Sequence, residues 1–282
     1  MQLSPRYDGP PVLRLDLDLG DPSVPMVRQR RRLGDVLSRL DEAQWNAASR
    51  CEAWSVRDVV CHLVTTNQFW TISITKALAG EPTRYLSTFD PVSSPAEIVD
   101  SMKAMTPAEI LAAYVDTVDE LAACLANLDE AKWSTIAEAP LGHVGLEAVT
   151  LHALWDSWIH ERDIVLPLGL SAAVEDDEVV GCLVYASALG PAFTASTGSE
   201  RPGSLAVVAT DPDVSFVIEH GSTVVVHAGP VPSSAPQLRG AAVALVEGLS
   251  FRVPLSHGLD DSDVWLLGAL GDVFDVTSTT SQ

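Results

Sequence analysis

The 282-residue sequence predicts an α+β fold, with an N-terminal four-helix bundle followed by a small α+β domain. Two observations predict it. Between about residues 25 and 168, apolar residues recur at the three- and four-residue spacing that lines one face of a helix. After residue 203, short β-branched runs alternate with turn residues, as in a meander of strands. We expect an N-terminal arm over 1–24, the bundle over 25–190 and the α+β domain over 200–282.

Four long amphipathic helices make up the predicted bundle. The first begins near Pro25, with the basic run 28–32 on its solvated face. Two more begin at Ser55 and Thr106, where a hydroxyl residue is followed three positions later by a carboxylate, the pattern of a capping box. The fourth runs over 146–163 and ends before a proline and a glycine.

The remaining elements are shorter, and each follows from local composition. The proline-flanked segment before residue 25 is assigned to the arm because its apolar alternation is too brief to define a strand. We expect a fifth helix near 173–188, strands over 205–210, 214–219 and 223–227, a helix over 240–249 and a further helix over 263–270.

Charge and composition exclude several classes of function. Lys and Arg total 17 against 38 Asp and Glu, a formal charge of -21, so the protein repels phosphate backbones and anionic lipid surfaces, and we expect neither nucleic-acid nor membrane partners. There is no uninterrupted apolar run of ~18 residues and no secretory signal pattern, so we expect a cytoplasmic protein. Four widely spaced cysteines without a Cys-x-x-Cys pair argue against a disulfide framework and a thiolate zinc site.

The residues that could perform chemistry form a polar row on the fourth helix. His152, Asp156 and His160 follow one another at intervals of four, which stacks their side chains beside an apolar stripe. His62 lies at the margin of the stripe on the second helix and could complete a site from across the bundle.

The sharpest hypothesis is a divalent metal, foremost zinc, held by His62, Asp156 and His160 with an open fourth position. Asp163, three residues after His160, could accept the second ring N–H of that histidine. A rival set replaces His62 with His152, but three ligands from one straight row rarely converge tetrahedrally. The other alternative is that these groups are polar residues at the edge of the core that satisfy one another.

Several other reactive or aromatic residues are assigned no chemical role. Cys61 directly precedes His62 in sequence, and consecutive side chains on a helix point about 100° apart, so we expect Cys61 in the core. Tryptophans at helical spacing are more often packing residues than pocket walls, and the remaining histidines lack acidic partners at ligand spacing. These residues are Trp54, Trp155 and Trp158, and His143, His220, His227 and His257.

Two segments together carry a resemblance to a known family. Residues 51–63 read CEAWSVRDVVCHL and residues 152–164 read HALWDSWIHERDI. Their combination resembles the mycothiol-dependent maleylpyruvate isomerase family, a branch of the DinB-like four-helix metalloproteins, over about residues 25–170. The resemblance implies metal ligands at His62, Asp156 and His160, the same set that the spacing favours. The carboxylate ligand of the family is glutamate, one methylene longer than Asp156.

The metal and the resemblance together predict an enzyme. A metal with an open position makes a bound thiol acidic, and the resemblance implies mycothiol as that thiol. We expect S-transfer to, or thiol-assisted isomerisation of, a small electrophile, and favour S-transfer because the sequence indicates no dicarboxylate pocket. Arg57, Arg84 and Arg252 are available for such a pocket, but spacing does not place them.

Two other classes of function stay open, together with the role of the C-terminal domain. The bundle could be a non-catalytic DinB-like binding or regulatory module. The same ligands could instead activate water in a metal-dependent hydrolase. The C-terminal domain could wall the thiol site, recognise substrate or mediate formation of a homodimer.

Overall fold

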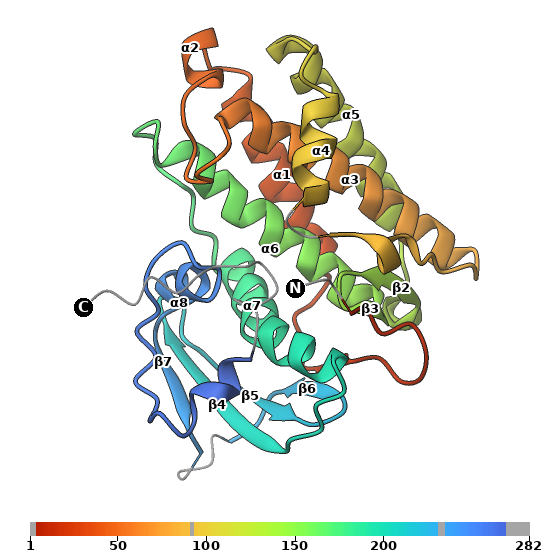
Figure 1. Cartoon of the computed structure of the whole chain (residues 1–282), viewed down its shortest axis with the longest axis vertical. Coiled ribbons are helices and arrows are strands. Elements are labelled where there is room, and N and C mark those ends of the chain that lie inside the picture. The colour runs from red at the N-terminus through yellow and green to blue at the C-terminus, as the bar shows by residue number, and fades with distance from the viewer. Residues whose placement is uncertain (1–3, 91–92, 231–234, 269–282) are drawn as a thin grey trace.

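Helices and a sheet occupy opposite ends of the molecule (Figure 1). The computed structural model describes residues 4–90, 93–230 and 235–268. The long helices of the N-terminal half form the upper part of the view, and the five-stranded sheet lies below them with α7 and α8 between. The predicted α+β fold is confirmed.

All four predicted helices of the bundle are present. They are α1 (Ser23–Leu37), α3 (Val56–Leu78), α5 (Pro107–Leu125) and α6 (Leu146–Val165). Both predicted capping boxes also form, since Ser55 accepts from the backbone N–H of Asp58 and Thr106 from that of Glu109, while each carboxylate accepts from the backbone N–H of its cap.

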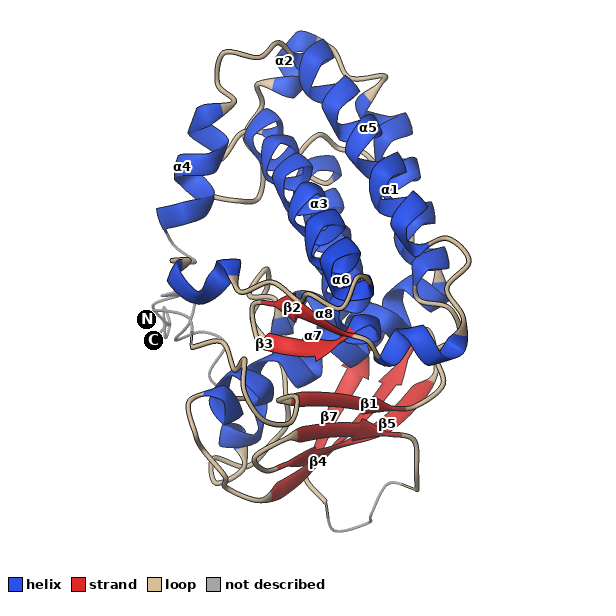
Figure 2. Cartoon of the chain, turned by 90° about the vertical axis from the view of Figure 1, so that its right-hand side faces the viewer, coloured by secondary structure: helices blue, strands red, loops and turns tan. Residues whose placement is uncertain are grey.

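Shorter elements connect the four long helices, and the sequence patterns did not indicate them. They are the helices α2 (Glu42–Trp45) and α4 (Ser93–Ser101), the 3-10 helices η1 (Tyr85–Thr88) and η2 (Glu130–Ser134), and the hairpin of β2 (Ile136–Ala139) and β3 (Gly142–Gly145). Figure 2 shows this hairpin between the bundle and the large sheet.

The basic run of α1 differs from the prediction. Arg30 is only 1% exposed, and Arg32 pairs with Glu161 at 2.8 Å and with Glu178 at 2.7 Å. The prediction that the run 28–32 is a solvated face is therefore wrong for these two arginines. Five consecutive residues turn through more than one full turn of helix, so part of any such run faces inward.

The longer of the two helices between the bundle and the sheet is strongly apolar. Helix α7 (Asp176–Ser196) corresponds to the predicted fifth helix and continues past Pro191. In the described part of the chain it alone is long and apolar enough to span a membrane, but 83% of that stretch is buried in the structure. It packs on α6 on one side and on α8, β5 and β6 on the other. Its apolar composition therefore follows from its position in the core.

The large sheet has the order β1-β6-β5-β4-β7. The predicted meander is β4 (Gly203–Thr210), β5 (Val214–His220) and β6 (Val224–His227), with antiparallel pairing throughout. Two parallel strands flank it, β1 (Leu13–Asp16) beside β6 and β7 (Gln237–Ala241) beside β4. Through β1, the N-terminal segment that was predicted as an arm is therefore part of the sheet formed by the C-terminal strands.

The C-terminal helices are shorter than the sequence predicts. Helix α8 (Ala242–Leu249) begins two residues later than expected, because Gly240 and Ala241 complete β7. The predicted helix over 263–270 appears as a 3-10 turn, η3 (Val264–Leu267), and residues 269–270 lie outside the described part.

One hydrophobic cluster includes buried residues of α3, α6, α7 and the sheet.

Replacing Leu13 by alanine tests whether β1 belongs to this core. The side chain is 2% exposed, and truncating a buried leucine costs about 2–5 kcal/mol, so Leu13→Ala lowers the free energy of unfolding measured by urea denaturation. The matched control is Arg14→Ala on the solvent face of the same strand, which leaves the midpoint unchanged. Equal midpoints for the two variants would contradict the pairing of β1.

Candidate functional site

The structure brings together His62, Asp156 and His160. His62 extends from α3, and the other two lie one turn apart on α6, which packs against it. His62 Nε2 and His160 Nε2 are each 3.6 Å from Asp156 Oδ1. One ligand atom from each residue lies within 4.8 Å of the other two.

The polar atoms of this cluster fit a metal better than they fit one another. His62 Nε2 and Asp156 Oδ2 are buried and lack hydrogen-bond partners among the described residues. The 3.6 Å separations are too long for hydrogen bonds. Around a tetrahedral zinc with bonds of about 2.1 Å, neighbouring ligand atoms lie about 3.4 Å apart. Two imidazoles and one carboxylate so arranged could hold a divalent cation.

Asp163 orients His160, as the sequence predicts. His160 Nδ1 lies 3.0 Å from Asp163 Oδ2, so the hydrogen bond leaves Nε2 directed at Asp156. Burial opposes the charged form of His160, but the bond to Asp163 and the contact with Cys51 outweigh it and raise the pKa to about 10. Burial also opposes ionisation of Asp156, but His62 and then His160 hold the pKa of Asp156 well below its usual range. A metal would therefore displace a proton from His160.

The end of α8 places Arg252 against Asp163. Phe251 adopts the left-handed region, with φ of 58°. The N–H of Phe251 donates to Gly248 O and that of Arg252 to Glu247 O, which together form a Schellman motif with phenylalanine in the usual glycine position. The tight turn directs the Arg252 guanidinium to Asp163, where Nε donates to Oδ1 at 2.9 Å and Nη2 to Oδ2 at 2.8 Å.

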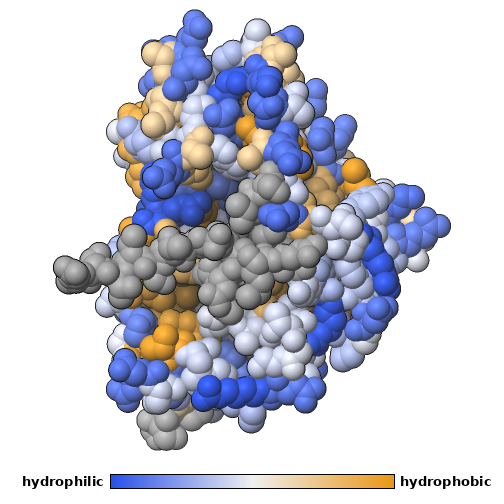
Figure 3. All heavy atoms as spheres, viewed as in Figure 1, coloured by the Kyte–Doolittle hydropathy of each residue, from blue (hydrophilic) through white to orange (hydrophobic). Residues whose placement is uncertain are grey.

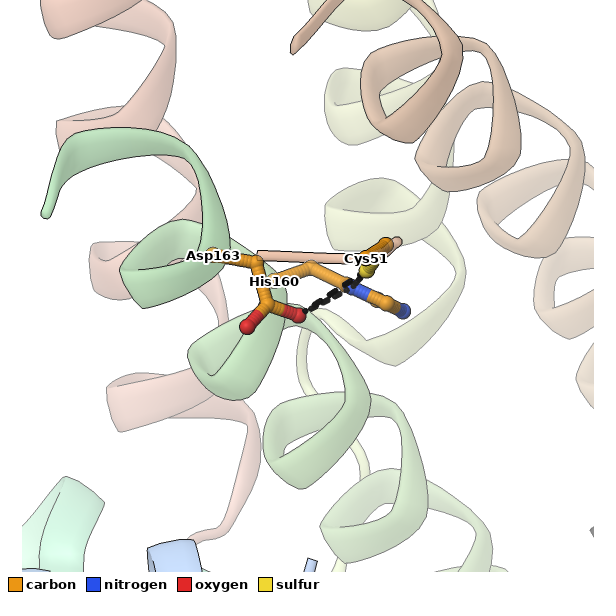
Figure 4. Close-up of side chains that lie close together, drawn as sticks. All are labelled: Cys51, His160 and Asp163. Atoms are coloured by element: carbon orange, nitrogen blue, oxygen red, sulfur yellow. Dashed lines mark hydrogen bonds and ion pairs between the residues drawn. The ribbon is translucent and has the colours of Figure 1, made fainter. Parts of the chain in front are cut away.

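Cys51 is a member of the site that sequence reasoning missed. Figure 4 shows its thiol beside His160 and Asp163, with Sγ 3.3 Å from Asp163 Oδ2 and 3.7 Å from His160 Nδ1. These three residues form a second candidate ligand group. However, His160 Nδ1 and Asp163 Oδ2 are already bonded to each other, and the charge of Arg252 balances the carboxylate. This second group is therefore saturated, unlike the first.

A cavity of about 590 Å³ opens beside the candidate ligands. Its wall includes aromatic side chains from α3, α6, η1 and the segments that precede α3 and follow η1 and α8. This size and composition are typical of small-molecule sites. These aromatic residues are Trp54, Phe69, Trp70, Tyr85, Phe89, Trp155 and Phe251. Trp54 and Trp155, for which packing was the favoured role, thus also line the cavity, whereas Trp158 is fully buried as expected.

The three arginines that the sequence left unplaced lie in different environments. Arg252 lines the cavity. Arg57 donates to the backbone carbonyls of Met102 and Met105, and Arg84 pairs with an aspartate on the surface. Arg252 lies 90 residues or more from every ligand candidate in sequence, so local spacing carries no signal for it.

The rival ligand set does not form. His152 lies one turn before Asp156, but its Nδ1 is bonded to the Tyr185 hydroxyl at 2.6 Å, and it is absent from both groups of converging ligand atoms in the described residues. Burial lowers the pKa of His152 to about 4, so the ring is neutral. Cys61 is fully buried, as predicted, and burial raises its pKa to about 11.

The molecular surface is mixed in hydropathy. On the face seen in Figure 3, hydrophilic side chains cover most of the upper helices, and a hydrophobic patch shows over the sheet at the lower left. The polar row of α6 lies beneath this surface, because His152 and His160 are 7% and 8% exposed. Access to the candidate ligands is therefore through the cavity.

Comparisons with known proteins agree with the fold of the chain. Two solved structures are similar in fold: a mycothiol-dependent maleylpyruvate isomerase and a histidine-to-alanine mutant of such an isomerase. Each has 15% sequence identity and a TM-score of 0.59, over 84% of this chain and 90% of the other. Among curated protein sequences, none matches the chain.

A family model matches the part of the chain that holds the three ligand candidates. It is the mycothiol maleylpyruvate isomerase N-terminal domain, over residues 27–165, which includes α3 and α6. The matched region contains His62, Asp156 and His160 and ends where α6 ends. Residues 27–165 therefore form a domain of the mycothiol maleylpyruvate isomerase family.

Proposed function

We propose that the protein is a divalent-metal-dependent enzyme that activates a small thiol, mycothiol, for attack on a small electrophile. The observation that carries the proposal is the convergence of His62, Asp156 and His160 on the wall of the cavity, with two buried atoms left without partners among the described residues. Family membership and the names of the similar structures support mycothiol as the thiol.

The metal would be held by His62 Nε2, His160 Nε2 and the Asp156 carboxylate. When bound, it supplies a charge that lowers the pKa of a thiol in its open position, so a thiolate forms near neutral pH. Two imidazole nitrogens and one carboxylate are the donors of many catalytic zinc sites, so zinc is the metal that we propose. The shorter Asp156 reaches the cluster because α6 packs directly on α3.

The other residues of the site hold the ligands and exclude water. Asp163 fixes the tautomer of His160, and the aromatic wall lowers the local dielectric around the reacting sulfur. Within the described wall of the cavity, Arg252 is the one Arg or Lys residue, and two of its nitrogens are already bonded to Asp163. A substrate with two carboxylates would therefore find few cations here.

S-transfer is for this reason our first candidate reaction, and thiol-assisted isomerisation is the second. Both begin with attack of the thiolate on an unsaturated carbon. In S-transfer the adduct is the product, whereas in isomerisation the thiol leaves after a bond rotation. We place the reaction in the reducing cytoplasm, where the four free cysteines and a thiol substrate would stay reduced.

Removing either histidine ligand tests the metal site. His62→Ala and His160→Ala each eliminate one of three ligands, and we expect both to lose the roughly one equivalent of metal that the purified wild type retains. Elemental analysis by plasma mass spectrometry measures it. His227→Ala, on β6 outside the cavity, is the matched control and keeps its metal. Full metal content in both ligand variants would refute the site.

Replacing Asp163 by asparagine tests the orientation of His160. Loss of a carboxylate that fixes a ligating histidine weakens metal binding by about 10–100-fold, measured by competition with a chromophoric chelator. The control is Glu161→Gln, which removes a buried carboxylate that pairs with Arg32 instead. Glu161→Gln lowers stability but not metal affinity. Equal affinities for the two variants would contradict the role of Asp163.

The dependence of rate on thiol distinguishes the proposed enzyme from its alternatives. With 4-phenyl-3-buten-2-one as the electrophile, we expect its consumption to rise with mycothiol concentration and to saturate. A metal-dependent hydrolase would instead consume ester substrates at a rate independent of thiol. A binding module would accelerate neither reaction above the buffer rate, and either of these results would exclude the proposal.

A further inference from the structure

A histidine on the wall of the cavity and a tyrosine behind it have no role in the proposed metal site. His152 lines the cavity one helical turn, about 6 Å, from Asp156 on α6. Tyr185 comes from α7 and is fully buried behind it. Their polar atoms meet at 2.6 Å, between His152 Nδ1 and the Tyr185 hydroxyl.

The tautomer of His152 follows from this contact. The hydroxyl of Tyr185 has His152 Nδ1 as its hydrogen-bond partner in the described part of the chain. A buried hydroxyl that keeps its single proton unshared is costly, so Tyr185 donates and Nδ1 accepts. The proton of the neutral imidazole then resides on Nε2. Burial raises the pKa of Tyr185 and lowers that of His152 to about 4, so both groups stay neutral.

Packing fixes the direction of the ring. Trp70 and Trp155 contact the imidazole, with ring centroids at 4.9 and 5.4 Å from it. Nδ1 is held by Tyr185 on the side of α7, so Nε2 is the nitrogen left for a molecule in the cavity. His152 therefore presents an N–H donor that needs no rearrangement when a substrate enters.

The aliphatic hydroxyls that line the cavity do not compete for this role. Ser250 donates to the backbone carbonyl of Val246, and Thr65 and Thr66 each donate to a backbone carbonyl three residues earlier in α3. Their protons are thus used within the helices. Trp70 Nε1 on the same wall also lacks a partner among the described residues, but that nitrogen is inaccessible, whereas the His152 side chain keeps a small exposed fraction of 7% at the cavity.

We propose that His152 Nε2–H donates a hydrogen bond to the carbonyl oxygen of an α,β-unsaturated carbonyl electrophile, and that Tyr185 is the residue that positions it. The inference rests on the proposed function and adds to the same site one hydrogen-bond donor for the substrate, His152, and one residue that positions it, Tyr185. His152 lies one helical turn from Asp156 on α6. This separation fits an electrophile whose reacting carbon faces the thiol while its carbonyl oxygen accepts from His152.

The donor acts where charge develops. The thiolate pair forms a C–S bond at the β-carbon, the π pair of the double bond shifts toward the carbonyl carbon, and the carbonyl π pair moves to oxygen, giving an enolate. The hydrogen bond from His152 strengthens as that oxygen becomes negative. Protonation at the α-carbon by water, which replaces the proton that the thiol released on ionisation, completes S-transfer. Alternatively, rotation about the Cα–Cβ bond, which is single in the enolate, and return of the electron pairs expel the thiolate, which completes isomerisation.

The tautomer is measured directly by NMR. In protein labelled with ¹⁵N-histidine, a two-bond ¹H–¹⁵N spectrum distinguishes the protonated ring nitrogen from the unprotonated one. We expect the proton of His152 on Nε2 in the wild type and a loss of this preference in Tyr185→Phe. A proton on Nδ1 in the wild type would overturn the inference, whether or not the enzyme turns over.

Kinetics with 4-phenyl-3-buten-2-one and mycothiol test the role in the reaction. Tyr185→Phe lowers kcat about 10-fold, and His152→Leu about 100-fold, while KM for the thiol stays constant. His152→Gln, which keeps an N–H near the position of Nε2, restores much of the loss.

The matched control is Tyr114→Phe, which removes an equally buried hydroxyl that donates to the Arg30 carbonyl, away from the cavity. Tyr114→Phe lowers the stability of the protein by about the contribution of one hydrogen bond, but it changes kcat less than 2-fold. Equal effects of Tyr185→Phe and Tyr114→Phe on kcat would reject the positioning role. If the wild-type protein has its His152 proton on Nε2 but consumes no electrophile in the presence of thiol, the proposed function is rejected instead of the tautomer.

Discussion

The buried carboxylate of Asp163 connects the three segments that form the candidate site. It accepts from His160 within α6, from two nitrogens of Arg252 after α8 and from the Cys51 thiol before α3. A buried negative charge is stable only when it is paired and fully hydrogen-bonded, so these partners must be in place together. The direction of His160 Nε2, and with it the cluster opposite His62, depends on this one group.

The central position of α6 explains why a polar row can face an apolar cavity. Helices α1, α3 and α7 surround it, so most of its residues are buried, including His152 and His160. Water is scarce there, and each polar atom needs a specific partner. Asp163 provides it for His160 and Tyr185 for His152, whereas His62 and Asp156 retain atoms without one in the described chain. The unpartnered atoms mark the position of the proposed metal.

Local sequence signals predicted the elements that depend on local physics. The capping boxes at Ser55 and Thr106 and the four-residue spacing on α6 are satisfied within one or two turns, and the structure contains them. Strand β1 was missed because its partner β6 lies about 200 residues later, so its stability comes from a contact that no local window contains. Arg252 and Tyr185 were missed for the same reason, since the packing of α7 and α8 on α6 brings them to the site.

X-ray absorption spectroscopy at the zinc edge of the metal-loaded protein tests the central claim most directly. A zinc ion between α3 and α6 has two imidazole nitrogens and a carboxylate oxygen at about 2.0–2.2 Å, and the imidazole multiple-scattering pattern disappears in part when His62 is replaced. A protein sulfur at about 2.3 Å in the absence of added thiol would place the metal at Cys51 instead and contradict the account.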